Sequence, residues 1–265
     1  MAKNIQLLII DPQNDFCDKK GSLYVQNADE DMKKLSKMIV AKKKVIDDID
    51  VTLDSHRWLH IAHPVWWSDS SGNSPAPFTV ISLDDINNGK WKARNPGFQQ
   101  RTKEYVEKLT ASGKYPLCIW PPHCLIGSWG HGVYPVLFEA LLEWEKEFAA
   151  VDYVTKGSNM FTEHYSVVKA DVEDDEDPTT KLNTKFIDRL QQADIIGVAG
   201  EALSHCVANS IRDIAEEFGE DQVAKFVLLE DASSPVTGFE DLAEGFMKEM
   251  TGRGMQVSNT NDFLA

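Results

Sequence analysis

The sequence predicts an α/β protein whose core is a parallel β-sheet covered by helices. Two observations lead to this prediction. Short apolar runs, such as IQLLII at residues 5–10, alternate with longer amphipathic stretches over most of the 265 residues. In those stretches, such as DMKKLSKMIV at 31–40, the apolar side chains recur every three or four residues, as on one face of a helix. This alternation is the pattern of βαβ units, and we expect a single domain that spans residues 1–265.

The predicted elements follow one another in this alternating order. The apolar runs predict strands at 5–10, 49–53, 115–119, 151–155, 195–199, 225–230 and 255–259. The periodic stretches predict helices within 31–40, 134–148 and 180–193, and from about 204 to 218. The helices are expected to cover the sheet.

Two segments depart from the alternation. Residues 68–114 are interpreted as an insertion within the domain, with a loop at SDSSGNSPAP (68–77) and an extra helix at 101–112 that ends near Gly113. The acidic run DVEDDEDP at 171–178 predicts a solvated loop, with weak cation binding as the alternative.

The composition narrows the class of partner. The formal charge of −15 argues against a nucleic-acid groove or an anionic membrane surface and favours a small ligand. No run approaches the ~20 apolar residues needed to span a bilayer, and the first residues lack a signal-peptide pattern, so we expect a soluble, cytoplasmic protein. The four cysteines are irregularly spaced, unlike a disulfide framework, and we expect them to be reduced.

Six polar or reactive residues directly follow predicted apolar runs. In a parallel α/β sheet, side chains at the carboxyl ends of the strands project into the crevice that the connecting loops form. These residues are Asp11, Asp54, His56, His123, Lys156 and Cys206.

Cys206 is the candidate nucleophile among them. It lies at the predicted start of a helix with an apolar stripe at Val207, Ile211, Ile214 and Phe218. Unpaired N–H groups and the helix dipole at such a position favour the thiolate over the thiol. The alternative is an inert cysteine buried at a strand-to-helix turn.

A nucleophilic cysteine needs a base and a positive group, and Asp11 and Lys156 can supply them. Each has a simpler interpretation: Asp11 as a turn residue before Pro12, and Lys156 as a solvated lysine before Gly157. The position of all three residues at strand ends favours a shared catalytic crevice.

A second group of residues has the chemistry of a metal site. The segment LDSHRWLHIAHP contains Asp54, His56, His60 and His63 within ten residues, and WPPHC adds His123 after a separate apolar run. Imidazole and carboxylate ligands suit zinc, iron(II) or manganese. The alternative is that DSH is only a turn with a histidine on the surface. His123, which would supply a third ligand from a separate segment, argues against this alternative.

Five motifs carry a resemblance to a known family. IDPQNDFC with a following GSL, TLDSH, IWPPHCLIG, VTKG and GEALSHCV occur in this order from Ile9 to Val207. Together they resemble the nicotinamidase/isochorismatase-like cysteine hydrolases, and DSH with WPPHC is most similar to nicotinamidases. The resemblance implies a three-layer α/β/α domain with a six-stranded parallel sheet, an amidohydrolase activity on nicotinamide, and assembly as a homo-oligomer.

The resemblance also implies roles for individual residues. Asp11, Lys156 and Cys206 match the catalytic triad. The N–H groups of Ala202 and Cys206 match the oxyanion hole, which is presented by a cis Glu201–Ala202 peptide.

In the same family a divalent metal, most often zinc with iron or manganese as alternatives, positions the ring nitrogen of nicotinamide. Asp54, His56 and His123 match its ligands. Phe16 and Trp120 match the aromatic residues that enclose the pyridine ring. His60 and His63 are not assigned to the metal, and His205 is expected to line the pocket.

Other functions remain open at this point. After HCLIG the chain has SWGHGVYP, where nicotinamidases commonly carry a threonine and a small-acidic pair, so another small amide, ureido or carbamoyl compound is an alternative substrate. A metallohydrolase with a passive Cys206 is a second alternative, and a ligand-binding protein without turnover is a third.

Overall fold

The structure, a computed structural model, describes residues 3–265. Its centre is a six-stranded parallel sheet in the order β5-β2-β1-β6-β7-β8. The strands are β1 (Ile5–Ile10), β2 (Asp48–Asp54), β5 (Asp152–Lys156), β6 (Ile195–Gly200), β7 (Phe226–Leu229) and β8 (Gln256–Ser258). The predicted α/β class and the six-stranded parallel sheet are confirmed.

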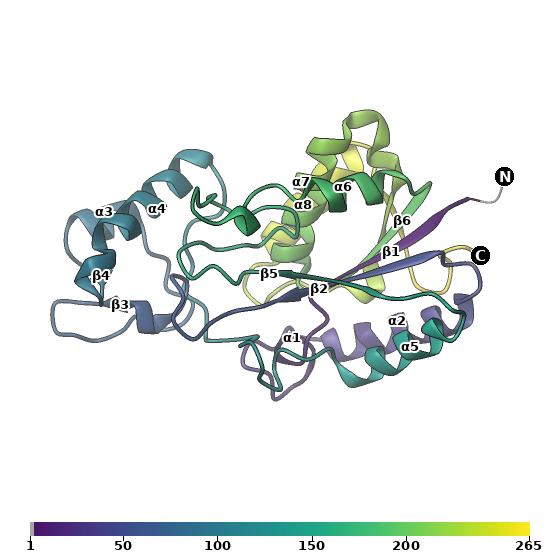
Figure 1. Ribbon diagram of the computed structural model, residues 1–265, viewed down its shortest axis with the longest axis horizontal. Coiled ribbons are helices and arrows are strands. Elements are labelled where there is room, and N and C mark those ends of the chain that lie inside the picture. Colours follow the sequence, from purple (N-terminus) through teal and green to yellow (C-terminus); the bar gives the residue numbers. More distant parts are fainter. Residues whose placement is uncertain (1–2) are drawn as a thin grey trace.

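Helices cover both faces of this sheet. Figure 1 shows α2 (Ala28–Lys42) and α5 (Pro135–Glu145) below it, and α6 (Thr184–Gln191), α7 (Ala208–Phe218) and α8 (Glu240–Gly252) above it. The apolar stripe predicted on α2 is buried, since Met32, Leu35 and Ile39 have no exposed surface. Full burial of each such side chain contributes about 1.5–3 kcal/mol to folding. The three-layer α/β/α arrangement is therefore confirmed.

The central strand β1 is covered on both faces. Leu7, Leu8, Ile9 and Ile10 are all fully buried, so this strand reads as a continuous apolar run instead of an alternating one. Because β1 pairs with β2 on one side and β6 on the other, the ends of these three strands are neighbours. This places the loops that follow them around one crevice.

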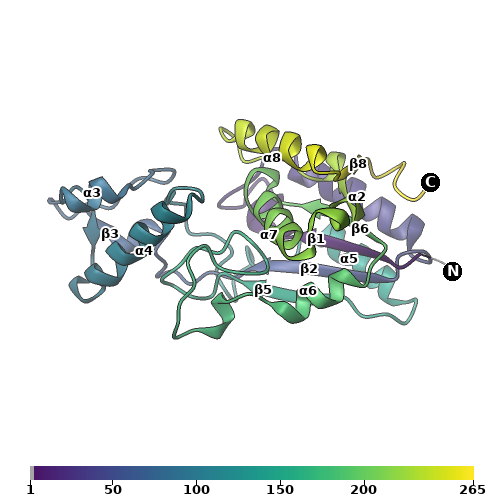
Figure 2. The same cartoon turned by 90° about the horizontal axis from the view of Figure 1, so that it is seen from above.

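The segment after β2 forms a small extension beyond the end of the sheet, as Figures 1 and 2 show. It contains an antiparallel pair of strands and two helices: β3 (Trp67–Ser68), α3 (Leu83–Asn87), β4 (Lys92–Ala93) and α4 (Gln99–Ser112). The predicted helix at 101–112 is confirmed as α4, which ends at Gly113 with a positive φ of 69°.

The remaining helical segments are short. They are α1 (Asn14–Cys17), the π-helical turn Leu203–Val207, and the 3₁₀ turns Pro64–Trp66, Pro96–Phe98, Pro178–Thr180, Glu220–Lys225 and Glu230–Ala232. Among the residues from 3 to 265, no helix is long and apolar enough to cross a membrane.

The strand predicted at 115–119 does not join the main sheet, so this prediction is wrong. The segment is extended, but it hydrogen-bonds with the insertion: Ile81 N–H donates to the Leu117 carbonyl (2.9 Å), and Ile119 N–H donates to the Thr79 carbonyl (2.9 Å). Leu117, Cys118 and Ile119 are nonetheless buried. Its apolar composition reflects burial beneath the insertion and not membership of the sheet.

The acidic run 171–178 is a loop, as predicted, but it is not solvated throughout. Asp171 is buried, which raises the pKa of its carboxyl group to about 7. Asp174 forms an ion pair with Arg101 of α4, and the Arg101 guanidinium lies 3.6 Å from the centroid of the Phe161 ring. The loop therefore holds α4 of the insertion against the main body of the chain.

Candidate active site

Neighbouring strands bring the predicted polar residues together. Asp54 and Lys156 are register partners at the ends of β2 and β5, and Asp11 follows β1, which lies beside β2. All six strand-end residues that the sequence singled out are buried. Since buried ionisable groups need partners, the contacts among them define the chemistry of the site.

Lys156 is at the centre of these contacts. Its Nζ lies 2.9 Å from Asp11 Oδ2 and 3.1 Å from Asp54 Oδ1, and it donates to the His164 carbonyl at 2.9 Å. The same Nζ is 3.5 Å from the sulfur of Cys206. A single buried ammonium therefore links the predicted nucleophile, the predicted base and a predicted metal ligand.

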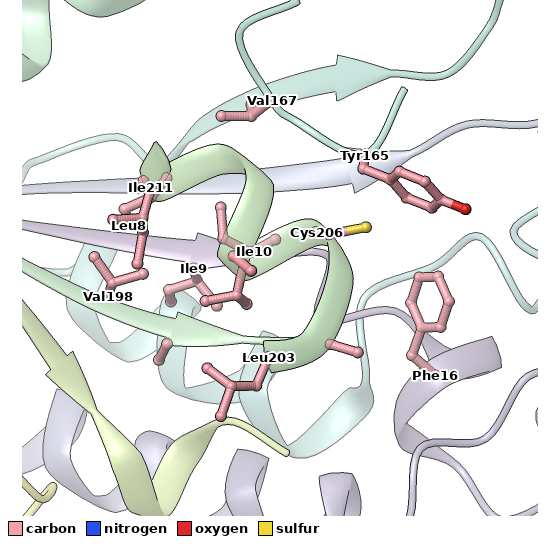
Figure 3. Packing of buried hydrophobic residues seen from close by; sticks show 14 of the residues in the cluster. Leu8, Ile9, Ile10, Phe16, Tyr165, Val167, Val198, Leu203, Cys206 and Ile211 are labelled. Carbon is pink, nitrogen blue, oxygen red and sulfur yellow. The ribbon is translucent and has the colours of Figure 1, made fainter. Parts of the chain in front are cut away.

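Cys206 lies in the π-helical turn Leu203–Val207, which runs directly into α7 at Ala208. The predicted start of a helical segment near Cys206 is therefore confirmed, although its first turn is π-helical and not α-helical. The apolar stripe at Val207, Ile211, Ile214 and Phe218 is buried as predicted. Figure 3 shows the sulfur of Cys206 projecting from this turn toward the space between Phe16 and Tyr165.

Asp11 is oriented by the neighbouring strand β2. Thr52 donates its hydroxyl to Asp11 Oδ1 and accepts the Asp11 N–H at 2.9 Å. This leaves Oδ2 to face Lys156, whose Nζ also contacts the Cys206 sulfur, so the Asp11 carboxyl and the thiol share one ammonium group as neighbour. The geometry is that of an acid–base group beside a thiol.

The ionisation of these groups follows from burial and from their neighbours. Burial raises the pKa of the Cys206 thiol well above its ordinary value, and Lys156 opposes this only in part. Burial also raises the pKa of Asp11, again opposed by Lys156. For Lys156 itself, burial would lower the pKa, but Asp11 and Asp54 together raise it well above its ordinary value. Cys206 therefore rests as a thiol beside a charged lysine, and its proton must be removed as it attacks.

The predicted metal ligands form a second cluster next to Lys156. Asp54 Oδ2 lies 2.9 Å from His56 Nε2 and 3.3 Å from His123 Nε2. Burial alone would raise the pKa of Asp54, but His56 and Lys156 hold it well below its ordinary value, so the carboxylate is ionised. The His123 Nδ1–H donates to the Pro121 carbonyl at 2.8 Å, which leaves the Nε2 lone pair free.

His60 and His63, which the sequence did not separate, have different hydrogen bonds. His63 Nδ1 donates to the Trp58 carbonyl at 3.2 Å, and its buried Nε2 has no partner among the described residues. His60 accepts the Ala62 N–H at Nδ1 (3.2 Å), so its Nε2–H donates to the Thr162 carbonyl at 3.1 Å. Although a ring nitrogen of each lies near His56, only His63 has a lone pair left for a metal.

These orphaned atoms fit a divalent metal. Both ring nitrogens of His56 and Nε2 of His63 are buried without a hydrogen-bond partner among residues 3–265. Burial lowers the pKa of His63 to about 3, so its imidazole is neutral and able to bind a cation. One carboxylate and several imidazoles are a donor set that zinc, iron(II) and manganese accept.

Gly157, in the VTKG motif, allows this cluster to pack closely. Its φ is 81°, and a Cβ at this position would lie 2.7 Å from Asp54 Oδ1 and 3.2 Å from His56 Cε1. Only glycine therefore suits both the backbone conformation and the space between β5 and the cluster.

A small cavity, partly open to solvent, lies between the thiol and the histidines. It is lined by Phe16, Leu23, Asp54, Trp120, His123, Glu163, Tyr165, Ala202, His205, Cys206 and Val236. Phe16, Trp120 and His205 therefore lie at the cavity, as predicted. Its small size and mainly apolar wall suit a small, flat, uncharged ligand.

The stretch SWGHGVYP, which suggested an alternative substrate, does not line this cavity. It packs against α1 instead, where Asp15 N–H donates to the Gly130 carbonyl (3.1 Å) and Asn14 N–H donates to the Gly132 carbonyl (2.9 Å). No lining residue belongs to the insertion at 68–114 either. The unusual loop is thus not by itself a reason for a different substrate.

Sequence reasoning missed several residues of the site. Glu163 and Val236 line the cavity, and no motif indicated them; Leu23 also lines it and is the last residue of the GSL motif, but it was not singled out. Gln13, in contrast, lies in the DPQNDF motif: its amide donates to the Asp54 carbonyl and accepts the Asp54 N–H, each at 2.7 Å. The DPQNDF motif thus supplies two residues of the site: Asp11, and Gln13, which fixes the backbone of Asp54.

The segment before the thiol has the expected backbone. The Glu201–Ala202 peptide is cis, and the Ala202 N–H donates to no other group in the described part of the chain. Ala202 also lines the cavity. Its free N–H is thus next to the thiol, where an oxyanion would develop.

Comparisons with known proteins were made at the level of sequence and of structure. No protein-family model and no curated protein is detectably similar in sequence. Solved structures do match. A nicotinamidase/pyrazinamidase from Acinetobacter baumanii is 20% identical with a TM-score of 0.67, and the match covers 98% of each chain.

Two further matches extend this likeness. The yeast nicotinamidase bound to the inhibitor nicotinaldehyde is 19% identical with a TM-score of 0.68, over 96% of this chain and 99% of that one. A pyrazinamidase from Pyrococcus horikoshii in complex with zinc is 18% identical with a TM-score of 0.56, over 97% and 99%. The chain therefore has the fold of these proteins over nearly its full length.

Proposed function

We propose that this protein is a metal-containing cysteine amidohydrolase that converts nicotinamide and water to nicotinate and ammonia. The observation that carries the proposal is the position of Lys156, whose ammonium group contacts Asp11, Asp54 and Cys206 beside a small cavity lined in part by aromatic side chains. The fold shared with solved nicotinamidases supports the same substrate.

In the proposed mechanism, the Cys206 sulfur attacks the amide carbonyl carbon while Asp11 accepts the thiol proton. Lys156 remains charged and holds Asp11 in place. The oxygen of the tetrahedral intermediate accepts hydrogen bonds from the N–H groups of Ala202 and Cys206.

The intermediate collapses when the C–N bond breaks, and Asp11 returns its proton to the leaving nitrogen so that ammonia departs. Asp11 then removes a proton from water, which attacks the thioester. Breaking of the C–S bond releases nicotinate, and the proton held by Asp11 restores the thiol.

We assign the metal to Asp54, His56 and His123, and we add His63 on the basis of its free, buried Nε2. When bound, the metal supplies a Lewis acid for the ring nitrogen of the substrate. Zinc is the metal we expect, with iron or manganese as alternatives, because the ligands suit it and a neighbour in fold is a zinc complex. The aromatic side chains of Phe16 and Trp120 then enclose the ring.

The test is ammonia release from nicotinamide by the metal-loaded protein and by three variants. Cys206→Ala is expected to abolish turnover and His123→Ala to reduce it. Cys118→Ala removes another buried thiol, outside the cavity lining, and is expected to keep the wild-type rate.

Two outcomes would contradict the proposal. Turnover that survives in Cys206→Ala would assign the attack to water instead of the thiol. A wild-type protein that contains metal and binds nicotinamide without releasing ammonia would be a binding protein.

A further inference from the structure

The segment that carries the proposed oxyanion donor contains a buried acid that the mechanism does not use. Glu201 directly precedes Ala202 and has no exposed surface. Its Oε2 accepts the Ser234 N–H at 3.2 Å, whereas Oε1 has no donor partner among the described residues. An ionised carboxylate in this position would lack most of its usual hydrogen bonds.

A second buried carboxyl group, that of Asp31 on α2, lies beside the same serine. Asp31 is 4% exposed. Its Oδ2 accepts the Ser234 hydroxyl at 2.5 Å. Ser234 therefore contacts both acids, through its backbone and through its side chain.

The segment from Ser233 to Val236 holds the residues around Ala202. The Leu203 N–H donates to the Ser234 carbonyl at 2.8 Å, and the Ser233 hydroxyl donates to the Gly200 carbonyl at 2.7 Å. The Val236 N–H donates to the Ser204 hydroxyl at 3.0 Å. Any displacement of Ser234 by the acids would thus be transmitted to both sides of Ala202.

We propose that Asp31 and Glu201 share one proton and that the resulting hydrogen bond positions the oxyanion-binding segment through Ser234. Both are positioning residues, because neither touches the substrate cavity. This inference rests on the proposed function, in which the Ala202 N–H stabilises the oxyanion.

The surroundings of the pair support a single shared proton. Burial raises the pKa of Glu201 well above its ordinary value and raises that of Asp31 to about 6. The shared proton is therefore assigned to Glu201, whose Oε1 has no other partner among the described residues.

Few charges near the pair could compensate for the loss of this proton. Lys34 Nζ lies 3.8 Å from Asp31 Oδ1, Asp231 adds a further negative charge, and Cys17 of α1 is a buried thiol near both acids. Lys34 is itself half exposed, which weakens its effect. Loss of the proton therefore leaves two negative charges in a buried contact, which repel each other and push Ser234 away.

The test compares Glu201→Gln and Asp31→Asn with the wild type across the alkaline range. Each variant keeps a hydrogen-bond donor in the pair but cannot acquire the second negative charge. In the wild type, kcat is expected to fall by roughly 10- to 100-fold as the proton is lost, because the loss of one oxyanion donor lowers kcat by about 100-fold or more. KM is expected to change little, since the oxyanion exists only after attack. Both variants should lose this decline in kcat.

Asp29→Asn is the matched control. Asp29 is another buried acid of α2, but it pairs with Tyr24, Lys19 and Lys33 and does not contact Glu201. Its variant should keep the alkaline decline of the wild type. The same decline in both Glu201→Gln and Asp31→Asn would overturn the inference, because it would assign the decline to other groups.

Two measurements without substrate separate this inference from the proposed function. The infrared difference spectrum between the wild type and Glu201→Gln at neutral pH should contain the band of one protonated carboxylic acid, which is absent from the difference between the wild type and Asp29→Asn. The thermal unfolding midpoint should fall on the alkaline side in the wild type and less so in both variants. If these signals are seen in a protein that does not hydrolyse nicotinamide, the proton-sharing pair stands and the proposed function fails.

Discussion

At the scale of single residues, hydrogen bonding determines which histidines can bind a metal. His60 and His63 lie in one short segment and are both fully buried. They differ because His60 uses both ring nitrogens within the protein, whereas His63 uses only Nδ1. A metal needs a free lone pair on nitrogen, so burial alone does not make a histidine a ligand.

This difference predicts distinct metal affinities for two variants. His63→Ala is expected to lower the affinity for zinc by at least about 10-fold. The loss of a residue that only supports a ligand lowers metal affinity by about 10- to 100-fold, and the loss of a ligand should cost at least as much. His60→Ala is expected to lower stability but to retain the metal. Metal bound per folded chain at a series of free zinc concentrations measures both, and equal losses in the two variants would contradict the assignment.

At the scale of elements, the pairing of β1 with β2 orients the proposed base. Thr52 on β2 reaches across to Asp11 at the end of β1, and its hydroxyl both donates to and accepts from that residue. Because the strands are hydrogen-bonded neighbours, this contact is set by sheet register and not by local sequence.

The variant Thr52→Val removes the hydroxyl with little change of shape. We expect kcat to fall by about 10-fold, which corresponds to about 1.4 kcal/mol in the barrier. The Thr52 hydrogen bond lowers the pKa of Asp11, so the acidic limb of the pH–rate profile should move to higher pH in the variant. Thr155→Val, on the exposed side of β5, is the matched control and should change neither quantity. An unchanged acidic limb in Thr52→Val would show that Thr52 does not tune Asp11.

At the scale of the whole molecule, several buried acids make stability depend on pH. The pKa values of Asp31 and Asp50 are raised to about 6 and that of Asp171 to about 7, in each case mainly by burial. An acid whose pKa is raised in the folded state stabilises the fold fully below its unfolded pKa and loses that contribution as the pH rises through the folded value.

We therefore expect the stabilising contribution of Asp171 to be lost as the pH rises toward about 7. The thermal unfolding midpoint of the wild type should fall relative to that of Asp171→Asn between about pH 5 and pH 7, because the amide of the variant stays neutral. Calorimetry of both proteins over that range is the measurement. A difference between the two midpoints that does not change with pH would contradict the prediction.

Two predictions from the sequence concern the whole chain, its domain organisation and its oligomeric state. The single domain from 1 to 265 with its insertion should appear as one cooperative unfolding transition. The expected homo-oligomer should appear in sedimentation.

Much of the fold was predictable because its patterns are local. The continuous apolar run of β1 and the spacing of Met32, Leu35 and Ile39 each indicate an element within a short window. The prediction of a sheet strand at 115–119 failed because it also rested on a local pattern. An apolar run shows that a segment is buried, but not which neighbour covers it. Only the contacts with residues 79–81 decided that.

By itself, the sequence determined which chemical groups are present, namely a thiol, acids, a lysine and a set of imidazoles, and that Asp11, Asp54 and Lys156 stand at strand ends. Only the tertiary structure decided their states and partners. It left His63 and not His60 with a free lone pair, placed Lys156 between Asp11 and Asp54, and brought Asp31 against Glu201 across 170 positions of chain. The physical reason is that ionisation and hydrogen bonding depend on burial and on neighbours in space, and these neighbours come from distant parts of the sequence.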